Sequence, residues 1–426
     1  MMFFENLKFS LQTLGCKVNQ YETQQIRENL LGHGFFEREY ENADIIIINS
    51  CTVTAESDRK TRQFLNKSRK KHPSAILVLT GCVLQAGATN AHKFDADIIM
   101  GNANNHLIVD LIIQFLNTKK QIIKIETHDK TQINAYINNF HGRTRAYLKI
   151  QDGCDRFCSY CIVPHARGRV RSKTLSIIKK EAETLSQNGF SEILLVGINL
   201  SAYEYNLAES VRTVCSVKKI KRVRLGSLEP DQITDEMLDM LKNEPKFADQ
   251  FHLSLQSGCD RILKLMNRQY DTVFYKNLVE KIRKIFPNAG ITTDIMVGFP
   301  SETQEDHKQS IEFVKQINFT SSHVFTYSPR PNTPAAIMDG QLSNAVKKKR
   351  SAEMIKLTDH LTKQFLISQK NKTLRVLFES YNKGINEGHA GNYVPVRVES
   401  DQDLHGQFCD VKIIKADFGF CYGFID

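Results

Sequence analysis

Six of the ten cysteines in this chain of 426 residues form two groups of three. The group that we call the central triad lies in a CxxxCxxC run and consists of Cys154, Cys158 and Cys161. The group that we call the N-terminal triad is spread along the sequence and consists of Cys16, Cys51 and Cys82. Thiolates are the ligands that hold a [4Fe–4S] cluster, which needs four of them. Three thiolates per cluster leave one iron open, and an open iron is a place for chemistry.

The N-terminal triad lies where strand and helix patterns alternate. Apolar, strand-like runs precede its three cysteines, at Lys8–Leu14, Asp44–Asn49 and Ala75–Thr80. Helical patterns over 21–31, 55–71 and 106–116 alternate with these runs, which predicts a parallel sheet. The carboxyl ends of parallel strands share one edge, where open α/β folds bind ligands. We therefore expect the triad to converge there, within an α/β domain of residues 6–135. The alternative is three unrelated core cysteines.

Six further strand patterns alternate with helical stretches in the middle of the chain. They are Ala146–Gln151, Glu192–Gly197, Val223–Leu228, Phe251–Leu255, Ile291–Val297 and His323–Tyr327. Right-handed βα units of this kind predict a partial (β/α)6 barrel over residues 140–370, with its reactive residues at the carboxyl ends of the strands. The central triad follows the first strand. Asn199, Glu229 and Gln256 follow later strands, and we predict that they contact cofactor or substrate. Ordinary loop or capping roles are the alternative.

The last part of the chain has a different pattern of apolar residues. An apolar stripe predicts a helix over 345–369. Short alternating segments with Gly and Asn turns follow it, and they predict a small antiparallel β-domain over residues 371–426. The polar stretch 120–145 is predicted to be a linker. The whole chain is therefore expected to be an α/β protein with a small β tail.

The composition favours a polyanionic partner. The formal net charge is +10, and basic side chains gather on the predicted helix 55–71, where Lys60 and Arg62 are candidate RNA contacts. A solvated helix face is the alternative for any single run. No apolar run approaches the about 20 residues of a membrane span, and the first residues lack the pattern of a secretory signal. We expect no membrane partner, a cytoplasmic location and reduced cysteines. Four cysteines without ligand-like spacing are predicted to be small buried residues: Cys215, Cys259, Cys409 and Cys421.

The central CxxxCxxC run, with aromatic Tyr160 before its last cysteine, resembles the radical S-adenosylmethionine (SAM) superfamily. The N-terminal triad ahead of it and the β-domain behind it resemble the methylthiotransferases of that superfamily, in which the tail is a TRAM domain. The resemblance covers nearly the whole chain. It implies that each triad holds a [4Fe–4S] cluster, that SAM binds at the central one, and that Tyr160 packs on the adenine of SAM.

The resemblance also implies a reaction. An electron from the central cluster cleaves SAM, and the resulting radical removes hydrogen from C2 of the adenine beside the anticodon of tRNA. The cluster on the N-terminal triad presents sulfur and a second SAM supplies methyl, so all six cysteines are predicted to be catalytic. The implied partners are the tRNA anticodon loop, an electron donor such as flavodoxin or ferredoxin, and a sulfur source. Beyond the central triad, candidates for holding the phosphates of that single-stranded loop are Arg167, Arg169 and Arg171. Surface charge alone is the alternative.

Several strings most resemble the branch that acts on N6-threonylcarbamoyladenosine at position 37 (t6A37). They are Gly15-Cys-Lys-Val-Asn-Gln-Tyr-Glu22, Cys51-Thr-Val-Thr54, Cys158-Ser-Tyr-Cys-Ile-Val-Pro164, Arg224-Leu-Gly-Ser-Leu-Glu-Pro230 and Asp294-Ile-Met-Val-Gly-Phe-Pro300. Lys17-Val-Asn19 discriminates best, because the isopentenyladenosine branch typically has Gln-Met-Asn there and the branch acting on a ribosomal-protein aspartate has Pro-Lys-Asn. Those siblings are the alternatives, followed by a non-catalytic iron–sulfur RNA-binding protein. A zinc site is weaker still, since structural zinc takes four ligands.

Overall fold

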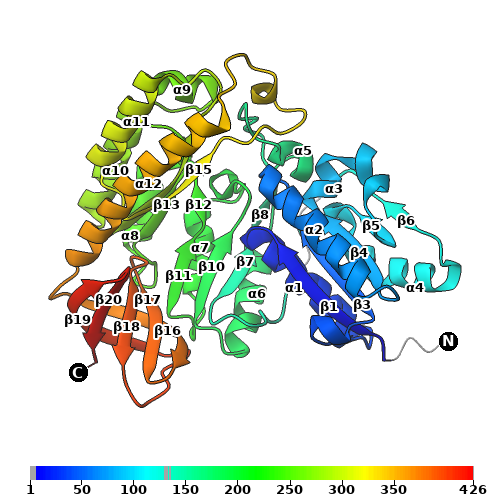
Figure 1. The fold of residues 1–426 in the computed structure, drawn as a ribbon. Coiled ribbons are helices and arrows are strands. Elements are labelled where there is room, and N and C mark those ends of the chain that lie inside the picture. The colour runs from blue at the N-terminus through cyan, green and yellow to red at the C-terminus, as the bar shows by residue number, and fades with distance from the viewer. Residues whose placement is uncertain (1–5, 129–132, 134–135, 426) are drawn as a thin grey trace.

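A fully parallel sheet forms the N-terminal part of the computed structural model, drawn in blue to cyan in Figure 1. In spatial order its strands are β2 (Phe36–Glu37), β1 (Lys8–Leu14), β3 (Ile45–Ser50), β4 (Ile76–Gly81), β5 (Ile98–Met100) and β6 (Ile122–Lys124). The helices are α1 (Lys17–Gly32), α2 (Ala55–Lys71), α3 (Cys82–Ala86) and α4 (Ile108–Thr118). The predicted α/β alternation is thus confirmed, and β6 is an additional strand within the stretch that we predicted to be a linker.

The isoleucine run of β3 packs into two hydrophobic cores, one on each face of this sheet. Ile45 and Ile47 pack with residues of α1 and α4, while Ile46 and Ile48 pack with residues of α2 and α3. A parallel strand buried on both faces needs such an uninterrupted apolar run.

The structure describes residues 6–128, 133 and 136–425. The predicted domain boundary at residue 135 and residues 1–5, which entered the argument against a secretory signal, lie outside this range. The domain limits therefore stay predictions. Within the described residues, no helix combines the length and apolar character needed to cross a bilayer.

Seven parallel strand segments form the central partial barrel, drawn mainly in green and yellow in Figure 1. They are β7 (Ala146–Lys149), β10 (Glu192–Val196), β11 (Arg222–Leu225), β12 (Ser227–Leu228), β13 (Gln250–Leu253), β14 (Gly290–Val297) and β15 (Ser321–Thr326). Because β11 and β12 are one strand interrupted at Gly226, these segments correspond to the six predicted strands. The helices that pack on the outside are α6 (Leu175–Gln187), α7 (Leu207–Cys215), α8 (Asp235–Lys242), α10 (Thr272–Ile285) and α11 (Gln304–Ile317).

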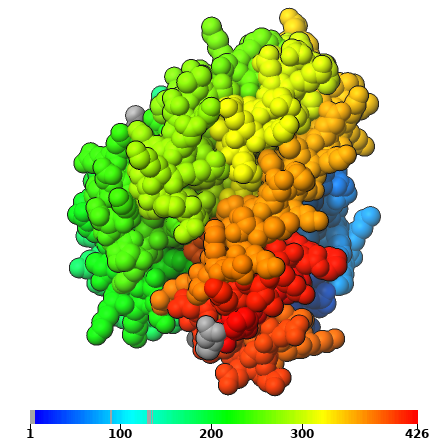
Figure 2. Space-filling model, turned by 90° about the vertical axis from the view of Figure 1, so that its left-hand side faces the viewer, coloured from blue at the N-terminus to red at the C-terminus, as the bar shows by residue number. Residues whose placement is uncertain are grey.

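The tail is a closed five-stranded barrel that follows α12 (Asn344–Ile367). In spatial order its strands are β16 (Thr373–Asn382), β17 (Ile385–Ala390), β18 (Pro395–Glu399), β20 (Phe420–Phe424) and β19 (Phe408–Asp417). Figure 2 shows this barrel, in red and dark orange, packed beside α12. The predicted small β-domain is confirmed, with one difference: β18 and β20 pair in parallel and close the barrel.

A buried carboxylate anchors the tail barrel to the central barrel. Glu192 of β10 accepts hydrogen bonds from Arg222 Nε and Arg224 Nε, both at 2.7 Å. The same two guanidinium groups donate to main-chain carbonyls of the tail, including those of Arg375 at 3.1 Å and Gly391 at 2.6 Å. Burial alone would raise the pKa of Glu192, but Arg224, Arg222 and Arg145 lower it from 4.5 to about 2.

The Glu192 carboxylate makes the free energy of unfolding depend on pH. The folded-state pKa of Glu192 is depressed, so its ionised carboxylate adds to the free energy of unfolding above pH 4.5. This stabilisation is lost as the pH falls toward about 2. We expect Glu192→Gln to lower the free energy of unfolding at neutral pH by about 3 kcal/mol. The variant should also lose less further stability on acidification. Urea unfolding of the cluster-free chain at several pH values measures both effects. Glu183→Gln, at an exposed position of α6, is the matched control, and equal acid sensitivity of wild type and Glu192→Gln would contradict the assignment.

Candidate functional site

The strand register brings the N-terminal triad to one edge of the sheet. Leu14, Ser50 and Gly81 are direct neighbours across β1, β3 and β4. Cys51 and Cys82 each follow the last of these strand residues directly, and Cys16 lies two positions after Leu14. Neighbouring strands lie about 4.8 Å apart, so the three thiols are brought into the same small region. The predicted convergence at the carboxyl edge is therefore present in the structure.

Glycine precedes a cysteine of each triad where the backbone leaves no room for a side chain. Gly81 has φ 107°, and a Cβ there would come within 2.3 Å of the carbonyl oxygen of Ser50. Gly153, before Cys154, has φ 76°, and its Cβ would come within 1.9 Å of the carbonyl oxygen of Arg169. Both positions require the conformational freedom of glycine, which turns the chain sharply into the cysteine.

Burial raises the pKa values of two thiols of the N-terminal triad, Cys82 and Cys51. Burial raises the pKa of Cys82 to about 12, and Cys51 and Cys16 add to the effect while Arg167 opposes it. Burial also raises the pKa of Cys51. Arg167 Nε donates a hydrogen bond of 3.2 Å to Cys82 Sγ, so a fixed positive charge lies against this sulfur. A cationic partner of this kind offsets the negative charge that a thiolate-bound cluster carries.

Arg167 belongs to a buried network of charges between the two domains. It forms an ion pair with Glu22 of α1 and lies 3.5 Å from Asp152. Lys149 bridges the same two carboxylates, at 3.2 Å from Glu22 and 2.9 Å from Asp152. Burial alone would raise the pKa values of both carboxyl groups, but Arg167 and Lys149 lower them. The network fixes α1 and its preceding Cys16 against the central barrel.

The central triad lies in the loop after the first barrel strand, as predicted. The short strands β8 (Gln151–Asp152) and β9 (Arg171–Ser172) pair around this loop, and α5 (Val163–Arg167) follows its last cysteine. Burial raises the pKa of Cys161 to about 12, and Cys158 and Cys154 contribute as close neighbours. The three thiols of the CxxxCxxC run are therefore gathered in one place.

Arg268 connects this triad to two of the predicted cofactor-binding residues. Its Nη1 lies 3.3 Å from Cys158 Sγ and 3.5 Å from the hydroxyl of Tyr160, and its Nη2 pairs with Glu229. The Tyr160 ring packs against an apolar cluster that includes Met296 and Phe299. Arg268 lies 110 residues after Cys158 in the sequence, so no motif spacing predicts their contact. The fold brings the two side chains together.

Asn199 and Gln256 present buried oxygens without partners at the carboxyl ends of the barrel strands. Both side chains are buried. Among the described atoms, Asn199 Oδ1 and Gln256 Oε1 accept no hydrogen bond. Gln256 is held with φ 67°, and its main-chain N–H donates to the carbonyl of Asp294 at 2.9 Å. Buried acceptors of this kind are costly unless a ligand satisfies them, so both residues fit contacts to SAM or substrate.

Helix α3 begins at Cys82 and packs against α5, which follows Cys161 (Figure 1). Asn102 donates both to Cys82 Sγ at 3.7 Å and to the carbonyl of Ala166 at 3.3 Å. A cavity of 360 Å³ is lined by residues of both domains. Thr52 and Ile162, the residues after Cys51 and Cys161, line it together with Arg62 and Arg330. The cavity therefore lies beside residues that adjoin one cysteine of each triad in the chain.

The predicted RNA contacts fall into buried and exposed positions. Arg167 is 1% exposed and Arg171 is buried as well, where it lies 3.4 Å from Asp152. These two arginines are consumed by the interdomain network, and the prediction that they hold phosphates is wrong. The Arg169 side chain is 64% exposed and lies over the ring of Phe157. Lys60 is exposed on α2, while Arg62 faces the cavity between the domains.

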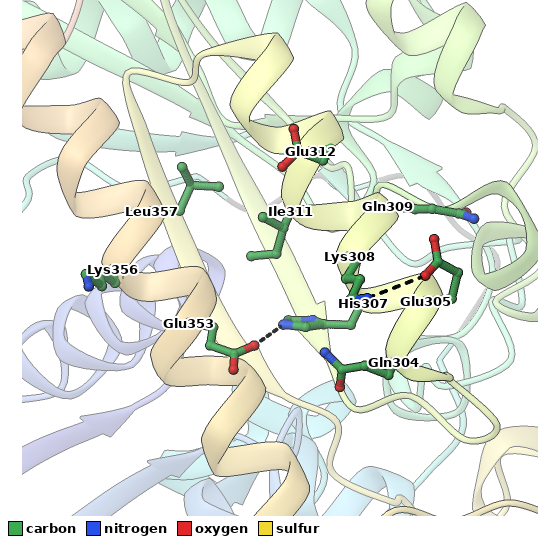
Figure 3. A pocket seen from close by; sticks show the side chains of 10 residues that line it. All are labelled: Gln304, Glu305, His307, Lys308, Gln309, Ile311, Glu312, Glu353, Lys356 and Leu357. Carbon is green, nitrogen blue, oxygen red and sulfur yellow. Dashed lines mark hydrogen bonds and ion pairs between the residues drawn. The ribbon is translucent and has the colours of Figure 1, made fainter.

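A second cavity, of 640 Å³, lies between α11 and α12 on the outside of the barrel (Figure 3). His307 points across it to Glu353, with Nε2 at 3.0 Å from the carboxylate. The residues that line this cavity include no cysteine and no predicted site residue. It is not part of the reaction site.

The arrangement suits iron–sulfur clusters better than single metal ions. Within the described part of the chain, no three His, Cys, Asp or Glu side chains converge on one metal ion. A [4Fe–4S] cube binds its cysteines through separate irons, so its ligands do not share one centre. Of the four cysteines predicted to be structural, Cys215, Cys259 and Cys421 are buried and Cys409 is half-buried. The three buried ones confirm that prediction.

Comparison with known proteins agrees with this division of the chain. The radical SAM superfamily matches residues 148–314, and the family described as uncharacterized protein family UPF0004 matches residues 8–101. Among solved structures, the radical SAM methyltransferase TsrM from Kitasatospora setae superposes with a TM-score of 0.59 at 13% identity. That match covers 78% of this chain and 77% of TsrM, and it shows a shared fold.

Relatives match the chain over nearly its full length. It is 34% identical to the threonylcarbamoyladenosine tRNA methylthiotransferase MtaB of Bacillus subtilis, over 97% of this chain and 95% of that protein. It is 36% identical to MtaB of Thermotoga maritima, over 95% and 93%. It is 33% identical to the tRNA-2-methylthio-N(6)-dimethylallyladenosine synthase of Clostridium botulinum, over 96% and 95%. Identity at this level over whole proteins shows that the chain belongs to the radical SAM methylthiotransferases, enzymes that use [4Fe–4S] clusters and SAM to transfer sulfur-containing groups.

Proposed function

We propose that this enzyme methylthiolates C2 of t6A37 in tRNA. The observation that carries the proposal is the triplet Lys17-Val18-Asn19 directly after Cys16, which differs from the Gln-Met-Asn of the isopentenyladenosine branch. MtaB proteins of three bacteria, at 33–36% identity, are consistent with it. The dimethylallyladenosine synthase at 33% identity shows that overall identity alone does not separate the two substrates.

The triplet is held by contacts with both domains. Asn19 is buried and donates to Asn49 Oδ1 at 3.1 Å and to the carbonyl of Ser50 at 3.2 Å, which holds the loops of Cys16 and Cys51 together. Val18 is buried against β10 of the central barrel. Residue 17 is therefore held where the two domains meet.

We assign the following roles to the residues of the two triads and their neighbours. The central triad holds the cluster that binds SAM, with Tyr160, Asn199, Glu229 and Gln256 in contact with SAM or the substrate base. The N-terminal triad holds the auxiliary cluster. When bound, these cofactors supply the radical that removes hydrogen from C2 and the sulfur and methyl that replace it. The protein orients them toward each other and excludes water.

The partners follow from this reaction. The tRNA anticodon loop approaches between the domains, with Arg169, Lys60 and Arg62 available to its phosphates. An electron donor such as flavodoxin or ferredoxin reduces the clusters, and a separate source replaces the consumed sulfur. We place the reaction in the cytoplasm, where tRNA is modified. The second candidate substrate is isopentenyladenosine in tRNA, because of the dimethylallyladenosine synthase relative. A ribosomal-protein aspartate is the third.

Nucleoside mass spectrometry of total tRNA tests the proposal. We expect deletion of the gene to remove the 2-methylthio form of t6A and to accumulate t6A. A wild-type copy should restore the modified nucleoside, whereas a copy with Cys51→Ala should not. The matched control is Cys215→Ala, at a buried cysteine outside both triads. An unchanged level of 2-methylthio-t6A after deletion would refute the substrate assignment, and a loss of the isopentenyladenosine derivative instead would support the second candidate.

A further inference from the structure

The cavity that both domains line is built from the loops that carry the cysteines. It has a volume of 360 Å³. The N-terminal domain contributes Thr52 and part of α2, and the barrel contributes Ile162 and the segment that follows β15. Thr52 directly follows Cys51 and Ile162 directly follows Cys161. The wall of the cavity therefore adjoins a cysteine of each triad in the chain.

A buried guanidinium group joins the two domains at this cavity. Arg330 lines the cavity, is only 6% exposed, and donates from Nη2 to Thr52 Oγ1 at 2.7 Å. The same nitrogen pairs with Asp58 Oδ2 on α2. Among the described atoms, the buried Arg330 Nε has no acceptor. An unpaired buried donor of this kind is costly unless a ligand accepts from it.

The charges that line the cavity are predominantly positive. Asp58 offsets Arg330, and its second oxygen, Oδ1, also has no partner among the described atoms. Arg62 and Lys93 add two further cations to the wall. Neither forms an ion pair with another described residue, and Arg62 lies over the ring of Phe94 with Cζ 6.0 Å from its centroid. Three cations therefore face one carboxylate, and the cavity carries an excess of positive charge.

A cavity with these donors fits an oxyanion. Guanidinium groups bind carboxylates and phosphates through paired N–H donors, and an ammonium group adds a point charge. The attraction is stronger inside a cavity than on an open surface, because the effective dielectric constant is lower there. The nucleotide t6A37 carries two kinds of oxyanion, the phosphates that flank it in the RNA backbone and the carboxylate of its threonylcarbamoyl group.

We propose that this cavity binds an oxyanion of the nucleotide that is modified, through Arg330, Arg62 and Lys93. The inference rests on the proposed function and adds the site that holds the nucleotide while its base is modified. The oxyanion is the threonylcarbamoyl carboxylate or a flanking phosphate, which share this chemistry and are distinguished below. Arg330 comes from the barrel and the other two cations come from the N-terminal domain, so binding requires both domains in the observed arrangement.

Three anticodon stem-loop RNAs test this inference. The first carries t6A, and the second carries t6A with a neutral carboxamide in place of its carboxylate. The third carries t6A with neutral methylphosphonates on both sides of nucleotide 37. We expect the wild-type enzyme to modify the first RNA with a kcat/KM about 10- to 100-fold above that of at least one neutral RNA, which corresponds to one charge-assisted hydrogen bond.

Arg62→Gln combined with Lys93→Gln is the test variant, because both side chains are exposed and the pair of Arg330 with Asp58 remains. The variant should lose the preference over the amide if the cavity binds the carboxylate, and over the methylphosphonate RNA if it binds a phosphate. Arg62→Lys with Lys93→Arg conserves both charges and should retain the preference. Lys308→Gln, on the outer helix α11, is the control and should behave as wild type.

The outcomes separate the inference from the function on which it rests. Iron content and SAM cleavage of the test variant should equal those of wild type, which distinguishes a lost binding site from a lost cluster. If the variant keeps every wild-type preference, or if wild type modifies all three RNAs equally, the inference is wrong and the function stands. If wild type cleaves SAM but leaves all three RNAs unmodified, the t6A assignment itself fails, and the inference falls with it.

Discussion

Replacement of any cysteine of the N-terminal triad by alanine should abolish methylthiolation but leave SAM cleavage intact. The two triads lie on different domains, and the central triad with Arg268, Tyr160 and Glu229 forms a separate contact network. On the proposed assignment, loss of Cys51 should remove a ligand of the auxiliary cluster without disturbing the site that binds SAM. Replacement of Cys158 should abolish both reactions. Liquid chromatography of 5′-deoxyadenosine and of the modified nucleoside measures the two activities in the same reduced sample.

Iron content provides the control for this experiment. We expect each triad variant to lose about half of the bound iron, because one cluster of two no longer assembles. Cys421→Ala, at a buried cysteine of the tail barrel, should retain both activities and all of the iron. If Cys51→Ala still methylthiolates the RNA, the N-terminal triad does not hold the cluster that presents sulfur. If it loses SAM cleavage as well, the two sites are not independent.

Arg167→Met should destabilise the protein by about 3–5 kcal/mol, the usual cost of leaving buried charges without their partner. Arg167 is 1% exposed, and its removal leaves Glu22 and Asp152 buried beside each other with Lys149 as their main remaining cation. The loss of the Nε contact to Cys82 should also reduce the iron held by the N-terminal triad. Urea unfolding followed by circular dichroism measures stability, and iron analysis measures the clusters.

Arg169→Gln is the matched control for Arg167→Met. Arg169 is largely exposed two positions away, so its removal should change stability by less than about 0.5 kcal/mol. It should instead weaken tRNA binding and reduce the dependence of that binding on salt. The double variant Arg167→Met with Glu22→Gln should recover part of the lost stability, because both charges of the pair are then removed. A stable Arg167→Met protein with weakened tRNA binding would restore the original phosphate-binding interpretation.

The sequence alone predicted most of the strands and helices and the grouping of the cysteines. The CxxxCxxC run is local, so its spacing already places three thiols in one loop. The N-terminal triad is not local, but each member follows a strand, and strand periodicity with short connections predicts a shared sheet edge. The register of β1, β3 and β4 confirms this shared edge. The order of the barrel strands followed from the same alternation of strand and helix.

Only the tertiary structure decided which charges face inward. Arg167 and Arg169 occupy the same basic run, yet one is buried and the other exposed. The difference depends on Glu22, which lies 145 residues away in the sequence and is brought against Arg167 by the packing of α1 on the barrel. The contact of Arg268 with Cys158 arises in the same way, between distant segments. Local spacing groups the central triad and strand periodicity groups the N-terminal triad, because both are patterns of the sequence itself. Burial and charge pairing belong to the packed domains, and no short stretch of sequence contains them.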